Sequence, residues 1–135
     1  MRILQLLALL TIGALGSCSI MNQQADFTDL GGSQWKLISI DGSPMSLGDN
    51  AILTFDEKEN KINGVAACNK FSADYEMLRK ALKFGSIVST KMYCEGKMDE
   101  ENKIISNLQN VTRYEVKANM LYLYSQDQLL LTYKR

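Results

Sequence analysis

The sequence predicts an α+β domain dominated by strands, folded as a curled antiparallel sheet or small barrel with one amphipathic helix packed on it. Three observations lead to this fold class. Short apolar segments, several with alternating side chains, recur at roughly 8 to 12 residues, as they do in small antiparallel sheets. Clusters of turn-forming residues separate these segments. A single stretch, from about Lys97 to Asn110, has its apolar residues at helical spacing instead.

Five strands are predicted before the helix. Each is a short apolar or alternating run followed by a change in pattern, and they cover residues 35–40, 51–55, 61–65, 71–78 and 81–88. The cluster from Asp41 to Pro44, which holds the only proline of the chain, predicts the first turn. The charged run from Asp56 to Asn60 predicts an exposed turn between the second and third strands.

The helix is predicted over about Lys97–Asn110 because the apolar residues there fall near helical spacing. These residues are Met98, Ile104, Ile105 and Leu108. Acidic residues gather toward the start, where the helix dipole stabilises negative charge. We expect the charged residues to form a solvated face and the apolar residues to lie against the sheet.

Three strands are predicted after the helix, at residues 112–117, 120–124 and 128–133. In the middle one, Met120, Tyr122 and Tyr124 share one face. Packing in the core is the preferred interpretation of this stripe. A binding patch is the alternative, because methionine and aromatic side chains are favoured at interface cores.

The chain begins with the three zones of an export signal. Arg2 supplies the positive end, Ile3–Ala14 forms the apolar run, and two small residues stand before the cut. The run is shorter than the roughly 20 apolar residues of a helix that spans a bilayer. Residues 15–18, Leu-Gly-Ser-Cys, resemble a bacterial lipobox, which predicts cleavage before Cys18 and attachment of acyl chains such as palmitate to it. The alternative is an ordinary secretory signal in which Cys18 stands by chance.

These features divide the chain into a signal peptide at residues 1–17, a lipidated N-terminus and tether at 18–29, and a domain at 30–135. Two or more acyl chains give stable membrane anchoring, so we expect a lipid-anchored envelope protein. Ser19 stands where an aspartate commonly retains lipoproteins in the inner membrane. The sequence therefore predicts the outer membrane if the cell has two membranes.

Charge and residue types exclude several classes of function. The chain has 15 Lys and Arg and 15 Asp and Glu residues, so losing Arg2 with the signal leaves 14 basic and 15 acidic side chains. That balance gives no basic stripe for nucleic acid. There is no histidine, which excludes Ser-His-Asp and Cys-His nucleophile systems and histidine-based zinc sites. No carboxylate pair resembles the acid couple of a glycosidase. We predict no catalytic residue, no metal site and no cofactor.

Two cysteines, Cys68 and Cys94, follow the lipobox cysteine. An even pair in an exported protein most simply forms a disulfide. It would close a loop of about 27 residues and stabilise the fold by roughly 3.5 kcal/mol in the chain-entropy model. A redox-active pair is the alternative, although such cysteines usually lie two residues apart at the start of a helix.

The residues around these cysteines resemble two motifs of the META domain, or HslJ-like, family. Gly64-Val65-Ala66-Ala67-Cys68-Asn69-Lys70-Phe71, followed by Tyr75, is similar to Gly-x-x-Gly-Cys-Asn-x-Phe…Tyr. Thr90-Lys91-Met92-Tyr93-Cys94 is similar to Thr-x-Met-Ala-Cys. The likeness covers about Leu30–Tyr133. It implies a small exported or lipid-anchored protein linked to heat shock, envelope stress or drug tolerance, with no established catalytic reaction.

The sequence departs from the family pattern at two positions. Ala67 stands where the family usually has glycine, which predicts that the backbone there needs no left-handed conformation. Tyr93 stands where it usually has alanine, beside the predicted disulfide. The likeness assigns no role to Asn69 or Thr90. We expect Asn69 to cap a turn with its side chain and Thr90 to end a strand.

Three functions are consistent with these observations. The first is a non-enzymatic envelope lipoprotein, a stress-related interaction or stabilising module that works by contact with another envelope protein. The alternative is a carrier of a small ligand or lipid in a cavity of the sheet. An enzyme that uses carboxylates or a redox thiol pair is the third.

Overall fold

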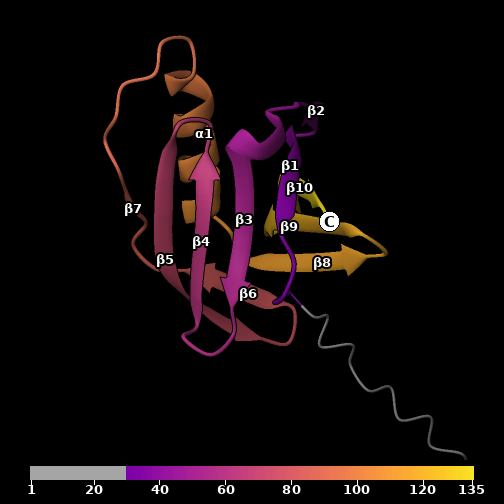
Figure 1. Ribbon diagram of the computed structural model, residues 1–135. Helices are drawn as coiled ribbons and strands as arrows, with labels where there is room; N and C mark the ends of the chain where they lie inside the picture. The colour runs from indigo at the N-terminus through magenta and orange to yellow at the C-terminus, as the bar shows by residue number, and fades with distance from the viewer. Residues whose placement is uncertain (1–29) are drawn as a thin grey trace, which may run out of the picture.

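The computed structural model describes residues 30–135 (Figure 1). The predicted signal peptide, the acylation site at Cys18 and the tether lie outside the described residues. The elements, in chain order, are β1 (Trp35–Ile40), β2 (Ser43–Pro44), the 3₁₀ helix η1 (Gly48–Asn50), β3 (Ala51–Asp56), β4 (Lys61–Ala66), β5 (Asn69–Leu78), β6 (Ala81–Phe84), β7 (Val88–Ser89), α1 (Met98–Gln109), β8 (Arg113–Lys117), β9 (Met120–Ser125) and β10 (Gln128–Lys134).

Antiparallel pairing closes eight of the described strands into a barrel, in the order β1-β3-β4-β5-β6-β8-β9-β10, with β10 paired back to β1. β2 pairs with β1 and β7 with β5 outside this circle. The predicted strand-dominant barrel with one helix is confirmed. Within residues 30–135, no helix is long and apolar enough to cross a membrane.

Inward-pointing side chains fill the barrel, and the helix covers part of it. α1 contacts β4, β6 and β10 and buries Ile104 and Leu108, which confirms its predicted apolar face. An eight-stranded barrel is just wide enough for side chains to fill its interior. The largest fully buried residues are Trp35, Tyr133, Phe84, Leu30, Leu53, Ile62, Leu82, Ile104, Leu108, Leu121, Leu123 and Leu131.

The strand predicted at residues 81–88 is wrong in its second half. β6 ends at Phe84, and the chain reaches β7 only after an irregular stretch. The side chain of Gln109, at the end of α1, supplies the reason. Its Nε2 donates to the carbonyl oxygen of Gly85 at 3.1 Å, and its Oε1 accepts from the backbone nitrogen of Ile87 at 3.4 Å. The helix thus bonds backbone groups that a continuous strand would pair with a neighbouring strand.

The stripe of β9 faces outward. Tyr122 and Tyr124 are half-buried on the outer face, whereas Leu121 and Leu123 are buried in the core. The preferred interpretation of the stripe as core packing is therefore wrong. Leucine fills the interior, and the tyrosines lie opposite the charged residues of β8, with Arg113 paired to Tyr124 in the register.

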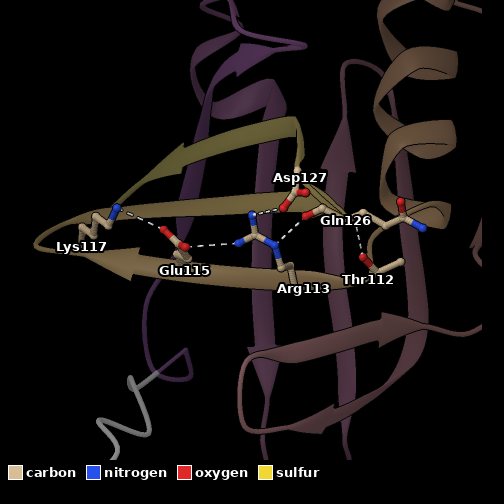
Figure 2. Close-up of polar contacts among 6 residues, drawn as sticks. All are labelled: Thr112, Arg113, Glu115, Lys117, Gln126 and Asp127. Carbon is tan, nitrogen blue, oxygen red and sulfur yellow. Dashed lines mark hydrogen bonds and ion pairs between the residues drawn. The ribbon is translucent and has the colours of Figure 1, made fainter.

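A polar network of this chain already occupies that outer face (Figure 2). The Arg113 guanidinium lies 3.8 Å from the centre of the Tyr124 ring and pairs with Glu115 at 3.2 Å and Asp127 at 3.8 Å. The hydrogen bond from Lys117 holds the pKa of the Glu115 carboxyl below its usual value. Arg113 therefore covers one face of Tyr124, which weakens the alternative of a binding patch there.

Tyr133 makes the barrel sensitive to alkali. Burial raises the pKa of its hydroxyl above the usual value. Because the folded pKa is the higher one, the stability linked to this proton is complete below about pH 10 and is lost as the pH rises further. In that range, the ionisation of this residue should lower the free energy of unfolding of the wild type by about 1.4 kcal/mol per pH unit.

We expect Tyr133→Phe to raise the pH midpoint of alkaline unfolding, measured by circular dichroism. Tyr124→Phe, on the outer face, is the control, and equal midpoints for Tyr133→Phe and wild type would contradict the expectation.

Candidate functional site

Asn69, the first residue of β5, is the centre of a buried polar network and is 1% exposed. Its Oδ1 accepts hydrogen bonds from the backbone nitrogen of Met92 at 2.8 Å and the hydroxyl of Thr90 at 2.7 Å. Its Nδ2 donates to the carbonyl oxygen of Met92 and to both carboxylate oxygens of Glu101, each at 2.9 Å. The prediction that Asn69 caps a turn is wrong, because its amide joins β5 to two distant segments. We call Asn69, Thr90 and Glu101 the polar clamp.

Glu101 joins the helix to this network. It is 5% exposed, and its Oε2 also accepts from the backbone nitrogen of Asn69 at 3.2 Å. The expectation of a solvated charged face holds for Asp99 and Lys103, which are exposed, but is wrong for Glu101. Helix geometry places Glu101 on the same face as the buried Ile104, three residues later. That shared face is the signal by which the sequence could have identified it.

Thr90 lies directly after β7 and extends its pairing with β5. Its backbone nitrogen donates to the carbonyl oxygen of Lys70 at 3.0 Å, and its Oγ1 accepts from the backbone nitrogen of Lys70 at 3.2 Å. The expectation that Thr90 ends a strand agrees with this position. Its hydroxyl has a further use that the sequence did not suggest, because it also donates to Asn69.

A disulfide joins Cys68 to Cys94 beside the clamp, with a Cα–Cα distance of 6.1 Å. Cys68 lies in the tight turn between β4 and β5, where Ala66 pairs with Asn69. Ala67 in this turn has φ +59°, so the expectation that its backbone needs no left-handed conformation is wrong. That conformation costs a non-glycine residue about 1–2 kcal/mol, of which burial of the methyl group returns roughly 0.8 kcal/mol.

The clamp and the disulfide fix a segment from which two large apolar side chains point into solvent. Within residues 90–94, Met92 is 59% and Tyr93 is 79% exposed. The backbone of Met92 is nevertheless bonded to Asn69 through both its nitrogen and its carbonyl oxygen. This segment, which we call the 90–94 segment, therefore presents two large apolar side chains from an anchored backbone.

The site offers little for catalysis or metal binding. Both of its cysteines are joined in the disulfide, and its buried carboxylate is bonded to an amide. In the part of the chain that the structure describes, no cluster of three or more His, Cys, Asp or Glu residues could hold a metal ion. The arrangement is suited to holding a surface in one conformation.

Comparison with known proteins agrees with the architecture and the motifs. A family model described as the META domain matches residues 28–135. The chain belongs to the META domain family. Comparison with curated proteins gives no match.

Three solved structures share the META-like fold. The first, an NMR structure, is 28% identical, with a TM-score of 0.62, covering 78% of this chain and 91% of the other. An NMR structure from Burkholderia xenovorans is 20% identical, with a TM-score of 0.63 and coverage of 82% and 86%. The crystal structure of a DUF4847 family protein from Bacteroides vulgatus is 12% identical, with a TM-score of 0.60 and coverage of 78% and 93%.

Three motif residues of this META domain, Gly64, Phe71 and Tyr75, lie in or beside the core and not at the clamp. Gly64 lies on β4 opposite Phe71 in the register. A Cβ atom at Gly64 would overlap the carbonyl oxygen of Ile52 and the Phe71 ring, so glycine allows this close packing. Tyr75 is buried and meets the Phe55 ring edge-on, with 5.4 Å between ring centres.

Replacing Gly64 with alanine should therefore destabilise the META domain. The added methyl group would overlap the backbone of β3, so the two strands must shift apart to accommodate it. We expect a loss of about 1–3 kcal/mol in the free energy of unfolding. Urea unfolding measures this loss. Gly85→Ala is a control for the change of residue type, since a Cβ there meets nothing closer than 3.6 Å. Equal losses for the two variants would contradict the packing argument.

Proposed function

We propose that this META domain protein is anchored to a membrane by acyl chains on Cys18 and works by non-enzymatic contact with another envelope protein, in a stress-related or stabilising role. One observation carries the contact: Met92 and Tyr93 are exposed on a backbone that the polar clamp and the disulfide hold in place. Single exposed apolar residues are ordinary on protein surfaces. Two adjacent ones on a fixed backbone lose little conformational entropy on binding, which favours association.

The chemistry of the chain supports contact over catalysis. No histidine is present in the sequence, and the clamp uses its carboxylate to hold an amide. Methionine and aromatic side chains are enriched at the centres of protein interfaces, whereas the balanced charge offers no basic surface for nucleic acid. The lipobox-like residues 15–18 support the anchor, and Ser19 favours the outer membrane of a two-membrane cell.

In-cell crosslinking tests the contact. A photoreactive phenylalanine replaces Tyr93 in the full lipoprotein, and Val88 provides the matched control because its side chain is similarly exposed, at 69%. We expect one envelope protein to be captured from position 93 and not from position 88. The same background from both positions would refute the interaction surface. The mass of the N-terminal peptide, with Cys18→Ser as the unacylated reference, tests the anchor separately.

A carrier is the second candidate, and a surface groove is the observation in its favour. A depression of about 760 Å³ lies between the β5–β6 hairpin, the end of α1 and the residues that lead into β8, with Met77, Ala81 and Val111 in its lining. Because side chains fill the interior of the barrel, this groove is a better place for a ligand than the interior. Native mass spectrometry of the purified lipoprotein tests the carrier function. A carrier should retain a bound small molecule, and the Ala81→Arg variant should lack it.

A further inference from the structure

The tip of the β5–β6 hairpin is apolar, basic and exposed. Leu78, the last residue of β5, is 76% exposed although it is still paired with Ala81 of β6. Arg79 and Lys80 form the turn between them, and both are exposed. Within residues 30–135, no carboxylate forms an ion pair with either cation. The tip is also braced from the side, since the carbonyl oxygen of Lys80 accepts from the backbone nitrogen of Tyr114 at 3.0 Å.

This tip lies at the end of the barrel where the described chain begins. Leu30 is buried, and the Trp35 indole donates to its carbonyl oxygen at 3.0 Å. Gly31 bridges to Phe55 near the end of β3, next to the β3–β4 turn. β5 passes that turn, because the backbone nitrogen of Tyr75 donates to the carbonyl oxygen of Asn60 at 2.9 Å. Figure 1 shows the start of the described chain and the β5–β6 hairpin together at the lower end of the barrel.

The length of chain before Leu30 keeps this end close to an anchor at Cys18. Twelve residue steps (30 minus 18) separate the two residues, and a fully extended chain spans at most about 3.6 Å per residue, or roughly 43 Å. The domain therefore stays within that reach of the bilayer. A contact between the domain and the bilayer that is too weak to recruit an unanchored protein can form in the anchored one, because the anchor raises the local concentration of the domain at the bilayer surface.

We propose that Leu78, Arg79 and Lys80 rest on the lipid surface that anchors the chain, with the leucine in the interface and the two cations against anionic headgroups. This inference rests on the acylation of Cys18 proposed above. Apolar side chains flanked by Lys and Arg suit the boundary between acyl chains and headgroups.

The β3–β4 turn at this end carries Asp56, Glu57 and Glu59, which an anionic surface repels, together with Lys58. β5 continues for three residues beyond Tyr75, which at about 3.3 Å per residue places Leu78 roughly 10 Å along the strand from Asn60, the last residue of this turn. Salt screens charges separated by about one Debye length, roughly 8 Å at physiological ionic strength, so this separation along the strand weakens the effect of the turn on the cations of the tip.

Tryptophan quenching in vesicles tests the contact. The full acylated protein is reconstituted in phosphatidylethanolamine and phosphatidylglycerol vesicles that contain brominated lipid. Leu78→Trp places a reporter at the tip, and Tyr93→Trp places one of similar exposure at the far end of β5. The native Trp35 is fully buried and gives the background.

We expect quenching at position 78 to exceed that at position 93 several-fold. Adding Arg79→Asn and Lys80→Gln to Leu78→Trp should lower the fraction of protein molecules whose tip contacts lipid on the order of tenfold. Replacing the anionic vesicles with neutral phosphatidylcholine vesicles should lower this fraction to a similar extent. Asparagine suits the left-handed backbone of Arg79, whose φ is +56°. Acylated protein with equal, background quenching at both positions overturns the tip contact and leaves the anchor standing. Protein whose mass shows no acyl chain on Cys18 overturns the anchor and this inference with it.

Discussion

Asn69→Leu should cost about 3 kcal/mol of unfolding free energy or more, because it leaves several buried polar groups without their hydrogen-bond partner. The variant removes the side-chain amide that donates to both carboxylate oxygens of Glu101, which is only 5% exposed. It also frees the backbone of Met92. Urea unfolding measures the loss, and hydrogen exchange at the Met92 amide should accelerate in the same variant.

A double-mutant cycle separates the clamp from simple loss of packing. Replacing both partners of a buried polar pair with apolar groups is often nearly neutral. The double variant Asn69→Leu with Glu101→Met should therefore lose less stability than the sum of its two single variants. Additive losses would show that the two side chains stabilise the domain independently, and would refute the clamp.

Removing the disulfide should have the second large effect. The double variant Cys68→Ala with Cys94→Ala leaves no free thiol and releases a loop with a sequence separation of 26. The chain-entropy model gives a loss of roughly 3.5 kcal/mol. For a domain of this size, this lowers the melting temperature by roughly 10–15 °C in calorimetry. Wild-type protein in reductant should melt near the double variant.

The polar clamp predicts that the variant without the disulfide keeps the conformation of the 90–94 segment. Because Asn69 bonds both the nitrogen and the carbonyl oxygen of Met92, the Met92 amide should stay protected from hydrogen exchange below the melting transition in this variant. Tyr93 should accordingly still crosslink to its partner. Lost crosslinking in a variant that is still folded would indicate that the disulfide itself positions the 90–94 segment.

The pattern of strands could be predicted from the sequence because alternation reports directly on which face of a strand is buried. It failed where a side chain from elsewhere intervened. Gln109 bonds the backbone after Phe84, and no period of 2 or 3.6 contains that information. The prediction for the stripe of β9 was wrong for a related reason. Alternation separates the two faces of a strand but does not say which face is buried, and here Leu121 and Leu123 lie in the interior while Tyr122 and Tyr124 lie on the outer face.

The candidate site was only half predictable. The motifs marked Asn69, Thr90 and the two cysteines, but assigned the asparagine a local role. Glu101 is 32 residues from Asn69, and its burial depends on how α1 packs. The left-handed Ala67 shows a second limit, since a residue type reports an average preference that one buried turn can override.

The pairing of β1 with β10 gives the barrel a definite order of assembly. Until Gln128–Lys134 are available, β1 lacks its partner on that side, and β9 lacks its own; unpaired strand edges promote aggregation. Pairing across almost the whole domain also slows folding. If the chain is exported as proposed, amino end first, it completes this barrel only after its last strand has crossed the membrane. Under that proposal, chaperones that shield strand edges should act on the chain during the interval between translocation and closure.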